Sequence, residues 1–350
     1  MTATAGSEKT RVLITGGAGY IGSHTARKFI DAGYEVVIFD NLSTGFKEAI
    51  PAEAIFVEGD IRDQDKVSET LAKYDIECVV HFASKLLVGE SVVHPYMYYE
   101  NNVVGSLMLL EACKKQNVNK IVFSSTAAVY GNGSEEMIID ESAPTSPLNP
   151  YGKSKLVIEG ILNDAHIAYD LNYVILRYFN VAGASVDLKN GQRTRNATHL
   201  IKVGAGAALG FSEQLQVFGN DYNTSDGTCI RDYIHVEDLA DIHVLAVKYL
   251  ERDGESTVMN CGYGKGFSVL DVINTLKKIS GHDFKVVISG RRPGDAEKLV
   301  ADSTKARKLL GWTPKYDNLE LICKTAYDWE MKFNQKKLTE KESAVQSVHL

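Results

Sequence analysis

Tyr151 and Lys155 are the two residues whose types and spacing best suit proton transfer. Of the 17 tyrosines, only Tyr151 is followed by a lysine four positions later, a spacing that places both side chains on one face of a helix. A free phenol has a pKa of about 10, and a nearby ammonium group favours its charged form. Tyr151 could then accept a proton from a substrate hydroxyl. The alternative is an ordinary exposed pair on an amphipathic helix.

Three hydroxyl side chains, Ser124-Ser125-Thr126, stand just after an apolar run at 120–123. A hydroxyl at the end of a strand can donate a hydrogen bond to a substrate oxygen and steady a proton transfer. The alternative is a polar loop whose hydroxyls bond back to their own backbone.

A glycine-rich turn, Thr15–Gly22, follows the apolar run Val12–Ile14 and opens a helical pattern. Its glycines at 16, 19 and 22 are spaced so that backbone N–H groups at a helix start can approach a diphosphate. The next apolar run, Glu35–Phe39, ends in Asp40, where an acid suits the adenosine ribose. An acid there repels a 2′-phosphate, which predicts NAD rather than NADP. The alternative is an ordinary strand–helix turn followed by a surface aspartate.

The elements that must position these residues alternate between strand and helix. Expected strands are Arg11–Thr15, Glu35–Phe39, Ala54–Glu58, Cys78–Phe82, Lys120–Ser124 and Asn172–Arg177. Expected helices are Gly19–Ala32, Asp63–Lys73, Asn101–Gln116 and Tyr151–Tyr169. Short β-branched runs between amphipathic stretches predict an α/β fold, a Rossmann-type doubly wound parallel sheet.

After Asn180 this alternation breaks, and a long polar loop covers Gly183–Asn196. Further expected elements are helices at Thr198–Leu209, Glu237–Arg252, Ser268–Ser280, Ser303–Leu310 and Leu319–Phe333, and strands at Leu215–Phe218, Val258–Cys261 and Lys285–Ser289. We predict a dinucleotide-binding domain at 1–180 plus about 234–262 and a smaller interleaved α/β substrate domain at 181–233 and 263–333. Residues 334–350 are charged and polar, as in a mobile tail.

Composition narrows the function classes. A net charge of −7 gives no basic field for nucleic acid or an anionic membrane. The five cysteines have no CxxC spacing, which favours reduced thiols and a cytoplasmic location. Met1–Lys9 lacks an apolar signal region, and no run approaches the length that spans a bilayer.

Motifs along residues 10–330 resemble a known group of enzymes. TGGAGYIG, SSTAAVYG and YGKSK are similar to the extended short-chain dehydrogenase/reductase superfamily, as are Asp40-Asn41, Gly59-Asp60-Ile61, His81-Phe82-Ala83, Asn101-Asn102 and Arg177–Asn180. Val88–Ser91, Phe218–Tyr222, Arg231–Val236 and Arg291–Asp295 resemble, within it, the UDP-glucose 4-epimerase family. The resemblance implies interconversion of UDP-glucose and UDP-galactose through a transient 4-keto sugar, with tightly bound NAD.

The resemblance also implies site residues, position by position. The catalytic set is Tyr151, Lys155 and Thr126. The cofactor set is Gly16, Gly19, Tyr20, Ile21, Gly22, Asp40, Asn41, Asp60, Ile61, Phe82, Ala83, Asn101, Lys155 and Tyr178. The substrate set is Ser125, Thr126, Asn180, His199, Leu200, Phe218, Arg231, Tyr233, Arg292, Asp295 and Leu299. No metal is implied. Two arginines in the substrate half of an acidic protein suit a diphosphate, although each could pair with a neighbouring acid instead.

Three positions depart from the family pattern. Thr126 stands where many relatives carry serine, Lys85 lies one place early in its loop, and His199 replaces a frequent asparagine. The roles of Lys85 and His199 therefore stay open.

Further partners follow from the same resemblance. Leu299 is at the position that gates the sugar pocket, so activity on N-acetylated UDP-hexosamines is open. A homodimer is implied through Asn101–Gln116 and Tyr151–Tyr169, although the apolar residues of these helices could equally face the sheet.

Three alternative functions share this fold. A nucleotide-sugar 4,6-dehydratase needs an added acid–base pair for elimination, and Ala127 and Ala128 occupy those places here. Another enzyme of the extended superfamily stays possible in principle. A non-catalytic NAD-binding sensor usually lacks the Tyr–Lys pair, which this chain has.

Overall fold

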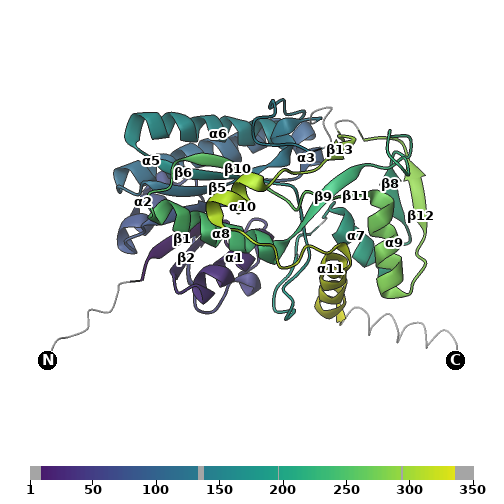
Figure 1. Cartoon of the computed structure of the whole chain (residues 1–350). Helices are drawn as coiled ribbons and strands as arrows, with labels where there is room; N and C mark the ends of the chain where they lie inside the picture. Colours follow the sequence, from purple (N-terminus) through teal and green to yellow (C-terminus); the bar gives the residue numbers. More distant parts are fainter. Residues whose placement is uncertain (1–8, 133–137, 196, 293–294, 336–350) are drawn as a thin grey trace.

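The computed structural model describes residues 9–132, 138–195, 197–292 and 295–335. Its centre is a sheet of seven parallel strands in the spatial order β10-β6-β5-β4-β1-β2-β3 (Figure 1). The strands are β1 (Arg11–Thr15), β2 (Glu35–Asp40), β3 (Ile55–Glu58), β4 (Cys78–His81), β5 (Lys120–Thr126), β6 (Asn172–Tyr178) and β10 (Thr257–Cys261). The predicted Rossmann-type fold is confirmed, and β10 returns from the second half of the chain to pair with β6.

Helices cover both faces of this sheet, which explains why its strands are apolar on both sides (Figure 1). On one face, Val12 and Ile14 pack in a cluster with Phe29 of α1 and Leu239 of α8. On the other face, Leu13 packs in a cluster with Val67, Leu109 and Ile158, which come from three further helices. The first face carries α1 (Tyr20–Asp31) and α8 (Val236–Glu251), and the second carries α2 (Gln64–Lys73), α5 (Gly105–Lys115) and α6 (Pro150–Tyr169).

The substrate half contains two small sheets and most of the remaining helices. In one sheet β9 pairs with three short strands, and in the other β8 pairs with β12. The strands are β7 (Asn180–Ala182), β8 (Leu215–Phe218), β9 (Ile230–His235), β11 (Gly266–Ser268), β12 (Val286–Ser289) and β13 (Lys298–Leu299). The helices are α7 (Leu200–Ala208), α9 (Val269–Ser280), α10 (Thr304–Leu310) and α11 (Leu319–Phe333). The sequence predicted these helices, β8 and β12, but not β7, β9, β11 or β13.

Short helical segments follow β2, β4 and β5 along the chain. The segment expected to start one continuous helix at Asn101 begins instead with a π-helix, η2. The short segments are η1 (Lys47–Ala49), α3 (Val88–Val93), α4 (Pro95–Tyr98), η2 (Tyr99–Val104) and η3 (Ala127–Tyr130). A π-turn often marks a functional position, because it displaces side chains from helical register.

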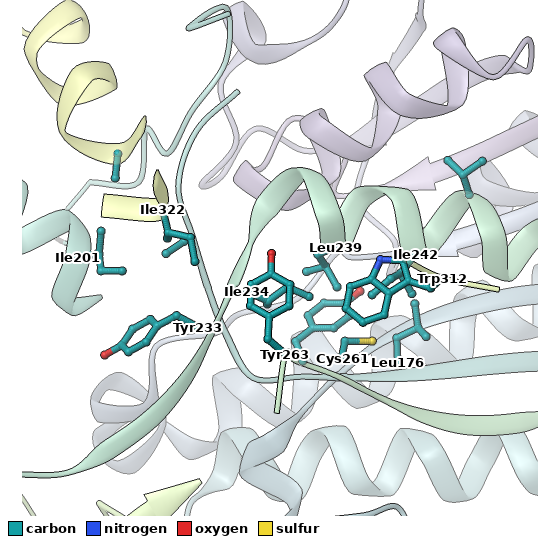
Figure 2. Packing of buried hydrophobic residues seen from close by; sticks show 14 of the residues in the cluster. Leu176, Ile201, Tyr233, Ile234, Leu239, Ile242, Cys261, Tyr263, Trp312 and Ile322 are labelled. Carbon is teal, nitrogen blue, oxygen red and sulfur yellow. The ribbon is translucent and has the colours of Figure 1, made fainter. Parts of the chain in front are cut away.

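One hydrophobic cluster joins the two halves of the molecule. Figure 2 shows Leu176 of β6 and Ile234 of β9 in this cluster, together with Ile201 of α7 farther into the substrate half. The two halves therefore share buried apolar surface instead of packing as separate cores. Within the described part of the chain, no helix is both long and apolar enough to cross a membrane.

Candidate active site

The glycine-rich turn between β1 and α1 forms a tight backbone cradle that has no room for side chains at Gly16 and Gly22. Gly16 has a φ of +71°, and a Cβ there would lie 2.6 Å from the backbone N of Ala83. A Cβ on Gly22 would lie 2.4 Å from the carbonyl oxygen of Gly16. Tyr20 and Ile21 begin α1, so their N–H groups lie at its positive end. This cradle fits the diphosphate of NAD.

Asp40 ends β2 beside this turn and is 8 % exposed. Its carboxylate accepts hydrogen bonds from the N–H groups of Ala18 at 3.0 Å and Leu42 at 2.8 Å. Burial raises the pKa of Asp40, and the two hydrogen bonds oppose that shift. Each carboxylate oxygen retains a second lone pair, so the group can also accept a ribose hydroxyl.

Asn41 and Asp60 lie on neighbouring strands' ends and contact each other. The Asn41 amide donates to the Asp60 carboxylate at 2.9 Å. Hydrogen bonds from the Arg62 guanidinium hold the pKa of Asp60 well below its usual range. Ile61 is buried against the helix that starts at Gly105. The structure thus places four of the predicted adenosine-side residues, Asp40, Asn41, Asp60 and Ile61, at adjoining strand ends.

The π-helix places Asn101 and Asn102 beside the end of β4. Asn102 is fully buried, and its amide donates to the Ser154 hydroxyl of α6 at 3.0 Å and to the carbonyl of Lys85 at 3.1 Å. Asn101 donates to the Asn102 side chain at 3.0 Å. The Lys85 backbone N–H also donates to Asn102, at 2.8 Å. Asn102 therefore ties the β4 loop that carries Phe82 and Ala83 to the helix that carries Tyr151, a link that the sequence did not predict.

Tyr151 lies in the first turn of α6, facing Thr126 at the end of β5. Asn149 caps the helix by accepting from the Gly152 N–H at 2.9 Å, and Pro150 suits the first helical position. Burial raises the pKa of the Tyr151 phenol, and a hydrogen bond with the Thr126 side chain opposes that shift. The Thr126 hydroxyl also accepts from the Ala128 N–H at 3.1 Å. The Thr126 hydroxyl thus lies near the Tyr151 phenol.

Lys155 lies one turn further along α6 and is only 2 % exposed. Its ammonium group donates to the carbonyl of Ser124 at 2.8 Å and lies 4.9 Å from the centre of the Phe123 ring. Burial lowers the pKa of Lys155 to about 7, while the carboxylate of Glu159 acts against that shift. The ammonium that was expected to favour the phenolate therefore titrates near neutral pH in the protein without ligands.

A buried ionic network lies behind the catalytic face, and sequence reasoning missed it. Glu159 of α6 pairs with Arg177 of β6, whose Nε donates at 3.1 Å and Nη2 at 2.6 Å. Arg177 also donates to the Tyr130 hydroxyl at 2.8 Å. Ser125 is 1 % exposed and donates to Glu159, so its hydroxyl lies in this network rather than in an open cleft.

Tyr178 lies at the carboxyl end of β6, between the sheet and α8. It is 6 % exposed, and its hydroxyl hydrogen-bonds with Nε2 of His243. The His243 ring lies 4.7 Å from that of Phe82, another predicted cofactor residue. Burial raises the pKa of the Tyr178 phenol and lowers that of His243 to about 4, so both are neutral at pH 7.

Four of the predicted substrate residues line one cleft in the substrate half. The cleft has about 440 Å³ of empty volume and is bordered by β7, α7, α11 and the loop at 183–195. Asn180, His199, Leu200 and Tyr233 all line it. His199 hydrogen-bonds with the Gln192 amide at 3.0 Å, and burial lowers its pKa.

The remaining substrate residues form two smaller groups. The Arg292 guanidinium lies 4.5 Å from the centre of the Phe218 ring and pairs with Asp295 at 2.9 Å. Leu299 of β13 lies opposite Arg231 of β9 in the sheet register. Leu299 also packs against the cluster that contains Ala127, directly after β5, and Phe179, directly after β6. Residues 293 and 294 of the Arg291–Asp295 motif lie outside the described residues.

Comparison with known proteins agrees with this arrangement. A family model described as the NAD-dependent epimerase/dehydratase family matches residues 12–262. The chain is 52 % identical to a UDP-glucose 4-epimerase of Azospirillum brasilense over 93 % of both chains. It is 44 % identical to a UDP-glucose 4-epimerase of Brucella ovis solved in complex with NAD, with a TM-score of 0.88, covering 91 % of this chain and 98 % of that one. It is 48 % identical to a UDP-Glc/GlcNAc 4-epimerase of Campylobacter jejuni, with a TM-score of 0.81 over 92 % of this chain and 99 % of that one.

Proposed function

The chain belongs to the NAD-dependent epimerase/dehydratase family, and from this premise we propose that it interconverts UDP-glucose and UDP-galactose with bound NAD. The observation that carries the proposal is the placement of Tyr151 in the first turn of α6, near Thr126 at the end of β5 and one helical turn from the buried Lys155. The relatives named UDP-glucose 4-epimerase support the choice of substrate.

In this proposal Tyr151 takes the proton from the 4-hydroxyl of the sugar and later returns it. Thr126 donates a hydrogen bond that lowers the energy of the phenolate, and Lys155 supplies positive charge nearby. NAD, when bound, would accept a hydride from carbon 4 of the sugar and give it back to that carbon, so no second redox substrate would be consumed. Because burial raises the pKa of Tyr151, positive charge in the loaded site is needed to make it a base near pH 7.

The substrate half would hold the UDP group while the sugar turns, so that either face of the sugar can be presented to the cofactor. Arg231 and Arg292 suit the diphosphate, since guanidinium groups bind phosphate oxygens in pairs. The cleft lined by Asn180, His199, Leu200 and Tyr233 supplies polar and apolar wall for the rest of the UDP group. The division between a cofactor half, 1–180 plus about 234–262, and a substrate half is part of this proposal.

The same proposal includes a homodimer formed around α5 and α6. These helices bury Leu109, Ile158 and Leu162 against the sheet, as one of the two alternatives expected. Apolar side chains are also exposed to solvent on η2, which precedes α5, and on α6. Val104 of η2 is 43 % exposed and Val157 of α6 is 44 % exposed. Exposed apolar residues on adjacent elements suit an interface between two copies.

The test is to incubate the purified protein with UDP-galactose, without added NAD, and to identify the products. UDP-glucose formed without added cofactor supports the proposal and shows that NAD is retained. A 4-keto-6-deoxy sugar would instead indicate a dehydratase, although Ala127 and Ala128 offer no acid–base pair for elimination. Absence of any product from protein that carries NAD would favour a sensor.

A further inference from the structure

The loop at 183–195 is held between the two halves from both sides. On the cofactor side, the Tyr20 hydroxyl of α1 donates to the carbonyl of Gly183 at 2.6 Å. On the substrate side, the Trp329 indole of α11 donates to the carbonyl of Gln192 at 3.3 Å. A Cβ on Gly191 would lie 2.4 Å from the Trp329 ring, so the loop backbone packs directly on that ring. These contacts fix the loop backbone on both sides of Gln192 and therefore the position of Arg193, the next residue.

A second cavity, with about 200 Å³ of empty volume, lies where this loop meets the glycine-rich turn. Its lining from the cofactor half is Ala18, Gly19, Tyr20, Thr44, Phe46 and Ala49. Its lining from the loop is Gly191, Arg193 and Thr194. Gln192 lines the UDP-sugar cleft, so consecutive residues of one loop border two different cavities.

Two arginines flank this second cavity without an acidic partner. The Arg193 guanidinium lies 5.0 Å from the Trp329 ring and 5.1 Å from the Phe333 ring, and its Nε is buried without a hydrogen-bond partner. The Arg195 guanidinium lies 5.5 Å from the Phe46 ring, which lines the cavity. Within the described ranges, neither arginine has a carboxylate oxygen within 4.0 Å.

The surroundings of Arg193 compensate its charge only in part. Burial lowers the pKa of Arg193, the carboxylate of Glu48 opposes that shift, and the positive charge of Arg27 adds a smaller lowering effect. The Nε of Arg27 is also buried without a hydrogen-bond partner. A partly buried guanidinium gains most from an ionised acceptor, because unpaired buried donors are costly. An anion in the cavity would pair with the charge of the Arg193 guanidinium and accept a hydrogen bond from it.

We propose that Arg193 and Arg195 close over the diphosphate of the bound dinucleotide from the substrate half of the chain. The assignment rests on the proposed function only for the identity of that dinucleotide as NAD. Backbone N–H groups of the turn would hold the diphosphate from one side and the two guanidinium groups from the other. Release of the cofactor would then require movement of the 183–195 loop, which is tied to both halves.

The experiment measures NAD affinity by calorimetry on protein stripped of cofactor, at low and high salt. Arg193→Gln removes the charge and should weaken binding by about tenfold or more, the effect of losing a hydrogen bond to a charged group. The salt dependence of binding should fall at the same time. Arg193→Lys, which keeps the charge, should recover part of the affinity. Arg307→Gln is the matched control, since Arg307 lies 5.1 Å from the Trp312 ring but far from the cavity in sequence and fold.

The results of these binding measurements distinguish a role of Arg193 and Arg195 in NAD binding from a purely structural role. They are also independent of the proposed reaction. An Arg193→Gln dissociation constant within twofold of the parent value would overturn it. If that variant does not fold, the exposed Arg195 carries the test, and Arg195→Gln must weaken NAD binding in the same way. Inorganic pyrophosphate should compete with NAD in the parent protein, whereas simultaneous binding would place the anion outside the cofactor site and refute the assignment. The experiment measures NAD binding and not catalysis. Failure of the arginine proposal would therefore not contradict epimerase activity, and the proposal can still be tested if the protein has no epimerase activity.

Discussion

Burial acts on Tyr151 and Lys155 in opposite electrical senses, because each side chain loses solvation of a different charge. The pKa of the phenol rises and that of the ammonium falls, so both neutral forms become easier to populate near pH 7. Each shift is opposed by one neighbour, Thr126 for Tyr151 and Glu159 for Lys155. The proposed proton transfer therefore depends on a small set of contacts that substitution can remove singly.

Tyr151→Phe should keep the fold and lose turnover. The ring still packs at the start of α6, and only the proton-transferring hydroxyl is gone. We expect the rate of UDP-galactose conversion to fall by roughly 10²–10⁴, as for loss of a general base. Steady-state kinetics on purified protein with a parent-like melting temperature is the measurement, and near-parent turnover would contradict the assignment.

Lys155 should make stability depend on pH in a defined window. The unfolded chain keeps this proton up to about pH 10.5, whereas the folded chain releases it near pH 7. The folded state is therefore favoured progressively as pH rises from 7 toward 10, by up to about 1.4 kcal/mol per pH unit. Urea unfolding at pH 7, 8 and 9 should show that the free energy of unfolding of the parent protein rises relative to that of Lys155→Met across this range. A constant difference between the two proteins would show that Lys155 does not titrate there.

Leu299 should set which sugars are accepted. It packs beside the residues that follow β5, and it is smaller than an aromatic side chain but still branched. We expect UDP-galactose to be preferred, with weak turnover of UDP-N-acetylgalactosamine. Leu299→Tyr should abolish the second activity and Leu299→Ala should raise it, because an N-acetyl group needs added space in a packed wall. Values of kcat/KM for both substrates in three proteins decide this, and an unchanged ratio removes Leu299 from the gate.

Local spacing predicted the Tyr151–Lys155 pair, because side chains four apart on a helix share a face. The same rule could have identified Glu159, four residues further along an apolar stretch. Its partner Arg177 could not be found that way, since a pair across two elements depends on how the helix packs on the sheet. For the same reason the sequence did not show that Ser125 bonds with Glu159.

At the scale of elements, α6 is fixed to the sheet by the buried Glu159–Arg177 pair, whose side chains are 6 % and 7 % exposed. Arg177→Met should lower the free energy of unfolding by about 3–5 kcal/mol, because it leaves a buried carboxylate unpaired. Urea unfolding is the measurement. Adding Glu159→Gln to that variant should recover part of the loss, since the uncompensated charge is then gone.

The control for this pair is Lys324→Met. Lys324 pairs with Asp328 on the surface, where its side chain is 57 % exposed. Removal of a surface pair should change stability by less than about 1 kcal/mol. Similar losses in the two variants would mean that the buried pair adds nothing beyond an ordinary surface contact.

The main helices and the strands of the central sheet were predictable because each carries its own pattern. The strands of the central sheet are continuous β-branched runs, and α9 shows a Ser268–Asp271 capping box in its sequence. The strands β7, β11 and β13 are two or three residues long and form because β9 lies beside them. Segments this short have no periodicity of their own, so only the tertiary structure reveals them.

At the scale of the whole molecule, the exposed apolar residues around α6 predict association. Val157→Glu should convert a dimer into monomers, because it places a charge within the proposed interface. Sedimentation velocity gives the mass directly. Ile288→Glu is the control, since Ile288 is 47 % exposed on β12 of the distant substrate half. A parent protein that is already monomeric, or a Val157→Glu variant that stays dimeric, would contradict this interface.

The return of the chain to the central sheet has a consequence for synthesis. The edge strand β10 and the covering helix α8 come from residues 236–261, long after β6 at 172–178. Until those residues leave the ribosome, β6 is an open sheet edge, and the part of the sheet face that α8 covers beside α1 is exposed. The cofactor half thus cannot finish folding until residues 181–233 of the substrate half have also been translated. A nascent chain halted near residue 230 should therefore be aggregation-prone and should recruit chaperones, although it already contains six of the seven central strands.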